Sequence, residues 1–179
     1  MTWELRFMEW ANGWGRSPVL DQVLPWLTHL GSVVAAALFI LVISVWTRRK
    51  EVFYRLALIS GFGLAIVHGL KFVVHRQRPP VYLWPTPSLS GGPGEILDHS
   101  FPSAHTFCAV MIATLLASWF PRYRLLFFVM AGFVGWTRIY LGLHYPTDVV
   151  AGALLGYGLT KILLHWIDVG VKRNPDVIL

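Results

Sequence analysis

The chain contains no Asp, Glu, Lys or Arg between Gln22 and Thr47. A helix needs about 20 mostly apolar residues to cross the hydrocarbon core of a bilayer. The segment from about Leu24 to Trp46 is therefore predicted to be a first membrane span. Four more apolar runs follow, at residues 56–74, 103–120, 125–143 and 147–169. We predict an all-α integral membrane bundle of about five transmembrane helices.

Composition supports this class of protein. The chain has 179 residues, of which 55% are hydrophobic and 13% are charged. Soluble domains carry about 25% charged residues, so a soluble fold is excluded, and the high hydrophobicity excludes disorder. Cys108 is the single cysteine, which rules out an internal disulfide. Residues 1–179 are predicted to form one membrane-embedded domain.

Two segments of this domain are predicted to lie outside the bilayer core. Residues 1–22 alternate charged side chains such as Glu4 and Arg6 with aromatic ones such as Trp3 and Phe7. This pattern is typical of an amphipathic segment that lies in the membrane interface. Residues 79–101 are rich in Pro and Gly. A loop of this length is usually functional or disordered. We expect it to lie on the outer side of the membrane, over the active site.

The positive residues near the span ends predict the orientation. They lie after the first span, between the third and fourth spans, and after the fifth: Arg48, Arg49, Lys50, Arg55, Arg122, Arg124, Lys172 and Arg173. Lys and Arg are enriched in cytoplasmic loops, so this face is predicted to be cytoplasmic. The N-terminus is then outside and the C-terminus inside, and we expect a bacterial inner (plasma) membrane. The formal net charge of +6 is scattered among apolar runs, which favours membrane lipids and an anionic substrate over nucleic acid.

A second set of polar residues lies at the predicted outer ends of four spans. The set comprises Lys71, Arg76, Arg78, Ser103, His105, Arg138, His144 and Asp148. Ionisable residues within membrane spans are functional candidates by default. Because four helix ends bring them to one depth on one face, we predict that they form a single site. Arg76 is interpreted separately, as a contact with the surface or with a lipid headgroup.

Three cations in this set indicate an anionic ligand. Lys71, Arg78 and Arg138 would repel one another near lipid unless an anion joined them. Arginine presents a planar fork that matches phosphate oxygens, and lysine presents a point charge. The stretch 102–105 is predicted to begin a helix, whose free N–H groups also favour an anion. The pocket is therefore predicted to bind a tetrahedral oxyanion, most plausibly phosphate.

Two histidines, His105 and His144, adjoin the predicted pocket. Either could act as nucleophile or as proton donor near neutral pH. Asp148 follows His144 by four residues, in the first turn of a helix that Pro146 is predicted to begin. Its carboxylate could hold one imidazole N–H and leave the other nitrogen free to attack. A divalent metal is the competing use of His and Asp. Three nearby cations disfavour it, so neither a metal nor another cofactor is expected.

These residues fall into three motifs. The motifs are Lys71-(six residues)-Arg78-Pro79, Pro102-Ser103-Ala104-His105, and Thr137-Arg138-(five residues)-His144-(three residues)-Asp148. In order and spacing they resemble the signature of the type-2 phosphatidic acid phosphatase superfamily, which also includes the vanadium haloperoxidases. The motifs cover about residues 70–150. This sequence departs from the family pattern in having Ala104 for a usual Gly, Thr137 for a usual Ser, and five predicted spans where the family often has six.

The resemblance implies a role for each residue. His144 would attack phosphorus and form a phosphohistidine, and Asp148 would orient it. His105 would protonate the leaving group and then activate water. The phosphoryl oxygens would be held, without a metal, by Lys71, Arg78, Arg138, Ser103 and the backbone N–H at Ala104.

The sequence therefore predicts a membrane lipid phosphatase that hydrolyses a lipid phosphate or diphosphate. Undecaprenyl diphosphate is the first expected substrate, followed by phosphatidylglycerol phosphate or phosphatidic acid. The alternatives are a lipid phosphotransferase, a lipid A phosphatase of the same family, and a phosphatase for a soluble phosphoester. An alternative of another class is a non-enzymatic lipid-binding or transport protein.

Overall fold

The computed structural model describes residues 2–48, 50–80 and 98–173, and within them it contains helices and no strand. The all-α class predicted from the sequence is confirmed. The α-helices are α1 (Trp3–Gly15), α2 (Pro18–Leu27), α3 (Val33–Thr47), α4 (Lys50–Val74), α6 (Ala104–Trp119), α7 (Arg124–Tyr140) and α8 (Pro146–Arg173). Two short 3-10 helices, η1 (Thr28–Gly31) and η3 (Pro121–Tyr123), precede α3 and α7.

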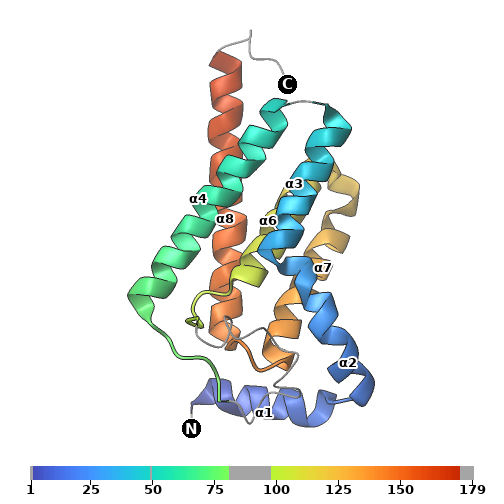
Figure 1. Ribbon diagram of the computed structural model, residues 1–179, viewed down its shortest axis with the longest axis vertical. Coiled ribbons are helices and arrows are strands. Elements are labelled where there is room, and N and C mark those ends of the chain that lie inside the picture. Colours follow the sequence, from blue (N-terminus) through green and yellow to red (C-terminus); the bar gives the residue numbers. More distant parts are fainter. Residues whose placement is uncertain (1, 49, 81–97, 174–179) are drawn as a thin grey trace.

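Helix α6 lies in the middle of the bundle and packs against α7 and α8, with α3 and α4 on its other sides. Helix α1 lies across one end of the bundle, beside the segment that follows α4 (Figure 1). The connection between α3 and α4 lies at the opposite end, as does the C-terminal end of α8. One end of the bundle is thus closed by a crosswise helix, and that end carries the site described below.

Within the described residues, two helices are long and apolar enough to cross a membrane by themselves, at Phe53–Val74 in α4 and Pro146–Trp166 in α8. A third span results if Pro18–Gly31 and Val33–Trp46 act as one bent unit. Helices α6 and α7 occupy the positions predicted for the third and fourth spans, but they have only 16 and 17 residues. A full crossing takes about 20 residues, so the count of about five spans stays a prediction.

The first predicted span is bent, where the sequence indicates one continuous helix. The two parts meet at 52°. The break lies at Ser32, whose extended backbone begins α3 and whose Oγ accepts a hydrogen bond from the Ala35 N–H over 3.0 Å. A serine in this role ends one helix and starts another. Helix α2 also begins at Pro18, so the boundary predicted at residue 22 falls inside a helix.

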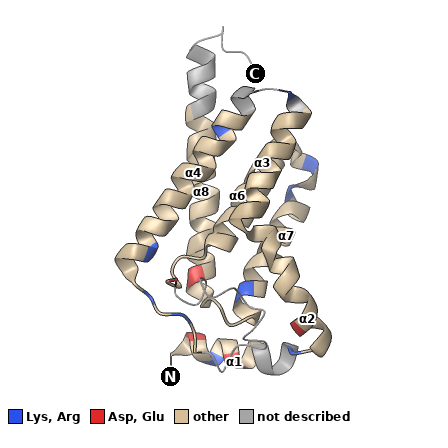
Figure 2. Ribbon diagram, viewed as in Figure 1, with Lys and Arg blue, Asp and Glu red and all other residues tan. Residues whose placement is uncertain are grey.

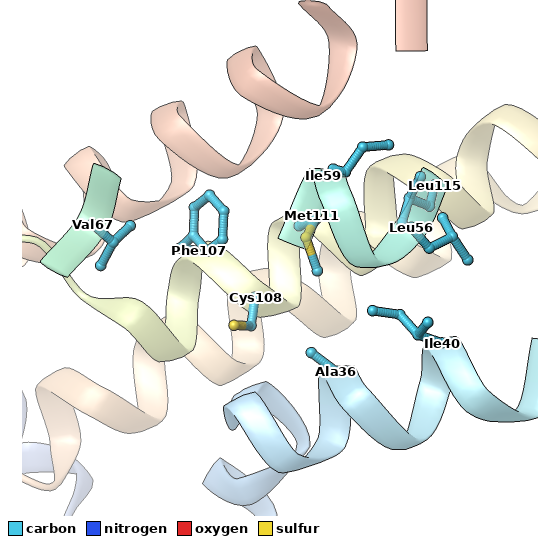
Figure 3. Close-up of a cluster of buried hydrophobic side chains, with 9 residues drawn as sticks. All are labelled: Ala36, Ile40, Leu56, Ile59, Val67, Phe107, Cys108, Met111 and Leu115. Carbon is cyan, nitrogen blue, oxygen red and sulfur yellow. The ribbon is translucent and has the colours of Figure 1, made fainter. Parts of the chain in front are cut away.

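The largest apolar cluster lies where α3, α4 and α6 meet (Figure 3). Its buried members are Ala36, Ile40, Leu56, Ile59, Val67, Phe107, Cys108, Met111 and Leu115. A Cβ atom at Gly63 would lie 2.2 Å from the Phe107 ring, so this glycine lets the ring pack against α4. The cluster holds α6 in a fixed position, and with it the residues at its N-terminal end.

Helix α8 approaches the backbone of α6 closely because of two glycines. A Cβ atom at Gly152 would lie 2.5 Å from the Ser103 carbonyl oxygen, and one at Gly156 would lie 2.6 Å from that of Phe107. Backbone atoms cannot move aside as a flexible side chain can. The spacing of the two helices therefore depends on these positions.

We expect Gly152→Ala to destabilise the protein by about 1–3 kcal/mol, the usual cost of overpacking. Thermal unfolding in detergent measures the effect. Gly158→Ala is the matched control, because a Cβ atom at Gly158 in the same helix meets nothing within 4 Å. Equal unfolding midpoints for the two variants would show that close packing at Gly152 contributes nothing.

Candidate active site

The charged residues that the structure describes gather toward the two ends of the bundle (Figure 2). At the end closed by α1, the turn between α7 and α8 carries His144. The Arg138 carbonyl oxygen accepts hydrogen bonds from the N–H groups of Leu143 (3.0 Å) and His144 (3.2 Å). Gly142 supplies the positive φ of 70° that this tight turn requires. The motif spacing from Arg138 to His144 thus corresponds to one turn that these hydrogen bonds hold together.

His144 and Asp148 form a buried pair. Helix α8 begins at Pro146, so Asp148 lies in its first turn, as predicted. The His144 Nδ1 lies 3.7 Å from the Asp148 Oδ2. The same oxygen accepts hydrogen bonds from the Ser100 hydroxyl and, over 2.9 Å, from the Tyr145 N–H. Ser100 Oγ also lies 3.5 Å from His144 Nδ1. Asp148 is therefore held on the side of the imidazole ring that carries Nδ1.

Arg78 lies on the other side of that ring. Its Nη1 is 3.5 Å from His144 Nε2 and donates to the Leu143 carbonyl oxygen over 2.9 Å. Its Nε donates to the Asp98 carbonyl oxygen over 3.0 Å. The two ring nitrogens of His144 therefore face opposite kinds of charge, with a carboxylate near Nδ1 and a guanidinium near Nε2.

Lys71 is buried and ion-paired. Its Nζ lies 2.7 Å from the Asp98 Oδ2, and it also donates to the His99 carbonyl oxygen. Burial by itself would raise the pKa of Asp98. The hydrogen bond and charge of Lys71, with the charge of Arg78, outweigh this effect and lower that pKa below its ordinary value. An anion thus stands beside two of the predicted phosphate-binding cations.

The remaining predicted residues lie at the same end of the bundle. Arg138 is 1% exposed, and its Nη1 donates to Thr28 Oγ1 over 3.2 Å. Ser103 caps α6, because its Oγ accepts from the Thr106 N–H (3.4 Å), and its own N–H donates to the Asp148 carbonyl oxygen (3.1 Å). Ala104 is the first residue of α6. His105 follows it in the first turn of α6.

The interpretation of Arg76 as a surface or lipid-headgroup contact is wrong. Its Nη1 lies 2.6 Å from the Asp148 Oδ1, and its Nη2 lies 2.5 Å from the Glu4 Oε2. The guanidinium carbon is 4.0 Å from the centre of the Tyr145 ring. Sequence spacing could not reveal this, because the partner Glu4 is 72 residues away on α1.

Sequence reasoning missed several polar contacts of the site, among them Glu4, Asp98 and Ser100. Glu4 resembles any charged residue of an amphipathic helix. Asp98 and Ser100 stand shortly before the second motif but outside its pattern. Of the predicted loop 79–101, residues 81–97 lie outside the described part of the chain. Among the residues that are described, no three His, Cys, Asp or Glu side chains come together as metal ligands.

His144 is held in its neutral form. Burial, the largest cause, lowers its pKa from 6.5 to about 3. The hydrogen bond that the imidazole donates to the Asp148 carboxylate opposes this change, and the positive charges of Arg138 and Arg78 add to it. A neutral imidazole has a nitrogen lone pair with which it can attack an electrophile. The arrangement therefore suits a nucleophile that works near neutral pH.

This lowered pKa predicts a pH-dependent stability. Between pH 6.5 and about 3 the unfolded chain binds a proton at His144 that the folded chain does not. Stability from this group is therefore complete above pH 6.5 and declines as the pH falls. We expect the unfolding midpoint of the native protein to fall relative to that of His144→Gln as the pH is lowered from about 7.5 to 5. A difference between the two midpoints that does not change with pH would contradict the assignment.

A family model identifies the class of protein to which this site belongs. The model of the PAP2 superfamily matches residues 52–171, which is more than half of the chain and includes all three motifs. The chain belongs to the PAP2 superfamily. The resemblance drawn from the motifs is therefore confirmed.

Individual relatives are similar over different lengths. An undecaprenyl-diphosphatase of Sulfolobus acidocaldarius is 36% identical over 69% of this chain and 60% of its own length. A lipid A 1-phosphatase of Rhizobium johnstonii is 36% identical over 64% of this chain and 49% of its own length. The chain thus spans about half to three fifths of the length of these two relatives. Phosphatidylglycerophosphatase B of Bacillus subtilis is 30% identical over 88% of this chain and 80% of its own length.

Two solved structures share the fold. A transmembrane PAP2-type phosphatidylglycerolphosphate phosphatase of Bacillus subtilis superimposes with a TM-score of 0.74 and 26% identity, over 92% of this chain and 84% of its own. LpxE of Aquifex aeolicus superimposes with a TM-score of 0.73 and 30% identity, over 92% of this chain and 96% of its own. Together with the apolar helices, these neighbours support an integral membrane location.

Proposed function

We propose that the protein is a membrane lipid phosphatase that works through a phosphohistidine at His144. One observation carries this proposal. Nδ1 of His144 faces a buried carboxylate, while its Nε2 lies 3.5 Å from Arg78, one of the cations suited to a phosphate. A nucleophile needs this asymmetry, with one nitrogen oriented by a base and the other directed at the electrophile. The names of the relatives support the same class of activity.

The proposed reaction has two displacements at phosphorus. In the first, Nε2 of His144 forms a P–N bond while the P–O bond to the leaving group breaks, and His105 gives that oxygen a proton. In the second, His105 takes a proton from water, the water oxygen bonds to phosphorus, and the P–N bond breaks. Asp148 stabilises the positive charge that develops on His144. No metal takes part.

The cations would hold the phosphoryl oxygens during both steps. Arg78 and Arg138 lie near His144 and act on its pKa as positive charges. Ser103 and the N–H groups at the start of α6, beginning with Ala104, would contribute further donors. Lys71 would complete the set by exchanging its carboxylate partner Asp98 for a phosphoryl oxygen. Such preorganised charge is the main source of rate enhancement in phosphoryl transfer.

We propose undecaprenyl diphosphate as the first substrate, with phosphatidylglycerol phosphate and phosphatidic acid next. The relatives named for undecaprenyl diphosphate and phosphatidylglycerophosphate support this order. Lipid A phosphate is the second candidate, favoured by the 36% identity to a lipid A 1-phosphatase and by the likeness to LpxE. All share a phosphate or diphosphate on a lipid anchor, which a site at one end of a membrane bundle can reach.

The proposed orientation places the site on the outer face of a bacterial inner membrane, with the N-terminus out and the C-terminus in. Arg48 and Arg55 flank the connection at the opposite end of the bundle, which would face the cytoplasm. Residues 1–22 would lie in the outer interface, because α1 exposes Trp3 and Trp10 by 63% and 60%. Tryptophan favours that depth.

A phosphate-release panel tests the function. The purified full chain is incubated in detergent with each candidate lipid, with a short-chain soluble phosphoester, and with a phosphoryl acceptor other than water. A lipid phosphatase releases free phosphate from lipids in preference to the soluble ester, and it keeps this activity in EDTA. Phosphate found on the acceptor would instead identify a phosphotransferase. If no lipid is turned over, the result would favour a non-enzymatic lipid-binding or transport protein.

A further inference from the structure

The carboxylate of Asp148 is held from two sides. Its Oδ2 faces the His144 ring and accepts from the Tyr145 N–H over 2.9 Å. Its Oδ1 accepts from the Arg76 Nη1 over 2.6 Å. Asp148 is fully buried, so its orientation depends on these partners rather than on water. Arg76 therefore fixes the oxygen that His144 does not use.

Arg76 is in turn held by α1. Its Nη2 pairs with the Glu4 Oε2 at 2.5 Å, and its Nη1 also donates to the Thr147 hydroxyl over 2.6 Å. That hydroxyl donates to the Glu4 Oε1 over 2.6 Å, and the Thr147 N–H approaches the same oxygen at 3.3 Å. Glu4, Arg76 and Thr147 thus form a closed ring of charge-assisted bonds, which are stronger than neutral ones. The ring joins α1 to the first turn of α8.

The burial of these groups indicates that the ring does more than anchor a surface helix. The Glu4 and Arg76 side chains are 10% and 26% exposed. The opposite side of α1 carries the exposed aromatics Trp3, Phe7 and Trp10, whereas Glu4 and Met8 point inward. A helix needs only apolar contacts such as those of Met8 to dock. A carboxylate at this point also neutralises Arg76, which would otherwise weaken the ability of Asp148 to stabilise a positive imidazole.

We propose that Glu4 is a positioning residue for the reaction, which acts through Arg76 to hold and tune the carboxylate of Asp148. This inference rests on the proposed function. It makes the N-terminal helix part of the catalytic apparatus, beyond its role at the membrane surface. Removing the outer partner of a metal-ligating side chain typically changes affinity or activity by about 10- to 100-fold, and we expect an effect of this size here.

The test uses the full chain with the lipid that it turns over. Glu4→Gln keeps the size of the side chain and removes its charge. We expect kcat to fall about 10-fold and KM to change less than about twofold, because the substrate contacts stay in place. Arg6→Gln is the matched control. It removes a charge from an exposed position of the same helix and should leave kcat unchanged.

The double variant decides whether Glu4 acts through Arg76. Arg76→Ala alone should lower kcat by about 10- to 100-fold. Adding Glu4→Gln to it should then lower kcat little further, because coupled residues are not additive. Full additivity of the two changes, or an unchanged kcat in Glu4→Gln, would overturn the proposal.

A second readout separates this proposal from the proposed function. The ¹⁵N spectrum of labelled histidine reports the tautomer and hydrogen bonding of the His144 ring without turnover, and His144→Gln identifies its signals. Glu4→Gln should shift these signals, and Arg6→Gln should not. If no lipid is turned over but the shift occurs, the function fails and the positioning role stands. If lipids are turned over and Glu4→Gln changes neither kcat nor the spectrum, the positioning role fails alone.

Discussion

His144→Ala is expected to lower the kcat for phosphate release by about 10⁴-fold or more, because it removes the atom that forms the covalent bond to phosphorus. Positioning and charge stabilisation by the remaining cations would leave only a residual rate. The loss should appear in kcat rather than KM, since Arg78 and Arg138 can still bind the phosphate group. Steady-state phosphate release in detergent measures the effect.

Two controls show whether this loss is specific to the His144 side chain and independent of a folding defect. His165→Ala removes an exposed histidine far along α8 and should keep full activity. His144→Gln retains a polar side chain in the buried turn and should be as inactive as His144→Ala while unfolding near the native temperature. Native activity in either His144 variant would remove the proposed nucleophile and favour a lipid-binding role.

Arg78→Ala has the second-largest expected effect, a loss of about 10²- to 10³-fold in kcat, the usual cost of removing one preorganised donor from a developing oxyanion. Its Nη1 lies 3.5 Å from the His144 Nε2, and its side chain is 7% exposed. A charge in so buried a position acts strongly on a phosphoryl group. Steady-state kinetics with the preferred lipid measures the loss.

Two further variants, Arg78→Lys and Arg122→Ala, test whether the effect depends on the guanidinium and on its position in the site. Lysine keeps the charge but cannot reach both the Leu143 and Asp98 carbonyl oxygens, which accept from Nη1 and Nε of Arg78. We therefore expect it to restore only part of the activity. Arg122 is exposed in η3, outside the site, and its removal should have no effect. An Arg78→Ala variant within about threefold of the native kcat would show that this residue is not part of the phosphate site.

Much of the fold follows from sequence because apolar runs and helix boundaries are local signals. Pro146 begins α8 and Ser103 caps α6, as their residue types predict. The bend at Ser32 was not predicted, since a single serine in an apolar run is common in spans. The bend lies beside a close approach to α6, because a Cβ atom at Gly31 would lie only 2.6 Å from the His105 carbonyl oxygen.

The site likewise has parts that local sequence signals predict and parts that depend on tertiary packing. The spacing of His144 and Asp148 is a local signal, and the structure brings the pair together. Glu4 and Arg76 form an ion pair although they are far apart in the sequence, and no spacing rule links them. Asp98 had no counterpart among the motifs, yet its carboxylate forms an ion pair with Lys71. Long-range ion pairs of this kind depend on tertiary packing, so motif spacing does not predict them.

Trapping the intermediate tests the central claim most directly. The native protein is mixed with a lipid whose terminal phosphate is labelled, quenched in base within one turnover, digested and examined by mass spectrometry, because phosphohistidine survives base but not acid. We predict label on the peptide containing His144, forming at least as fast as phosphate is released, and none in His144→Gln. Phosphate release without label at His144, or with label on another residue, would contradict the proposed mechanism.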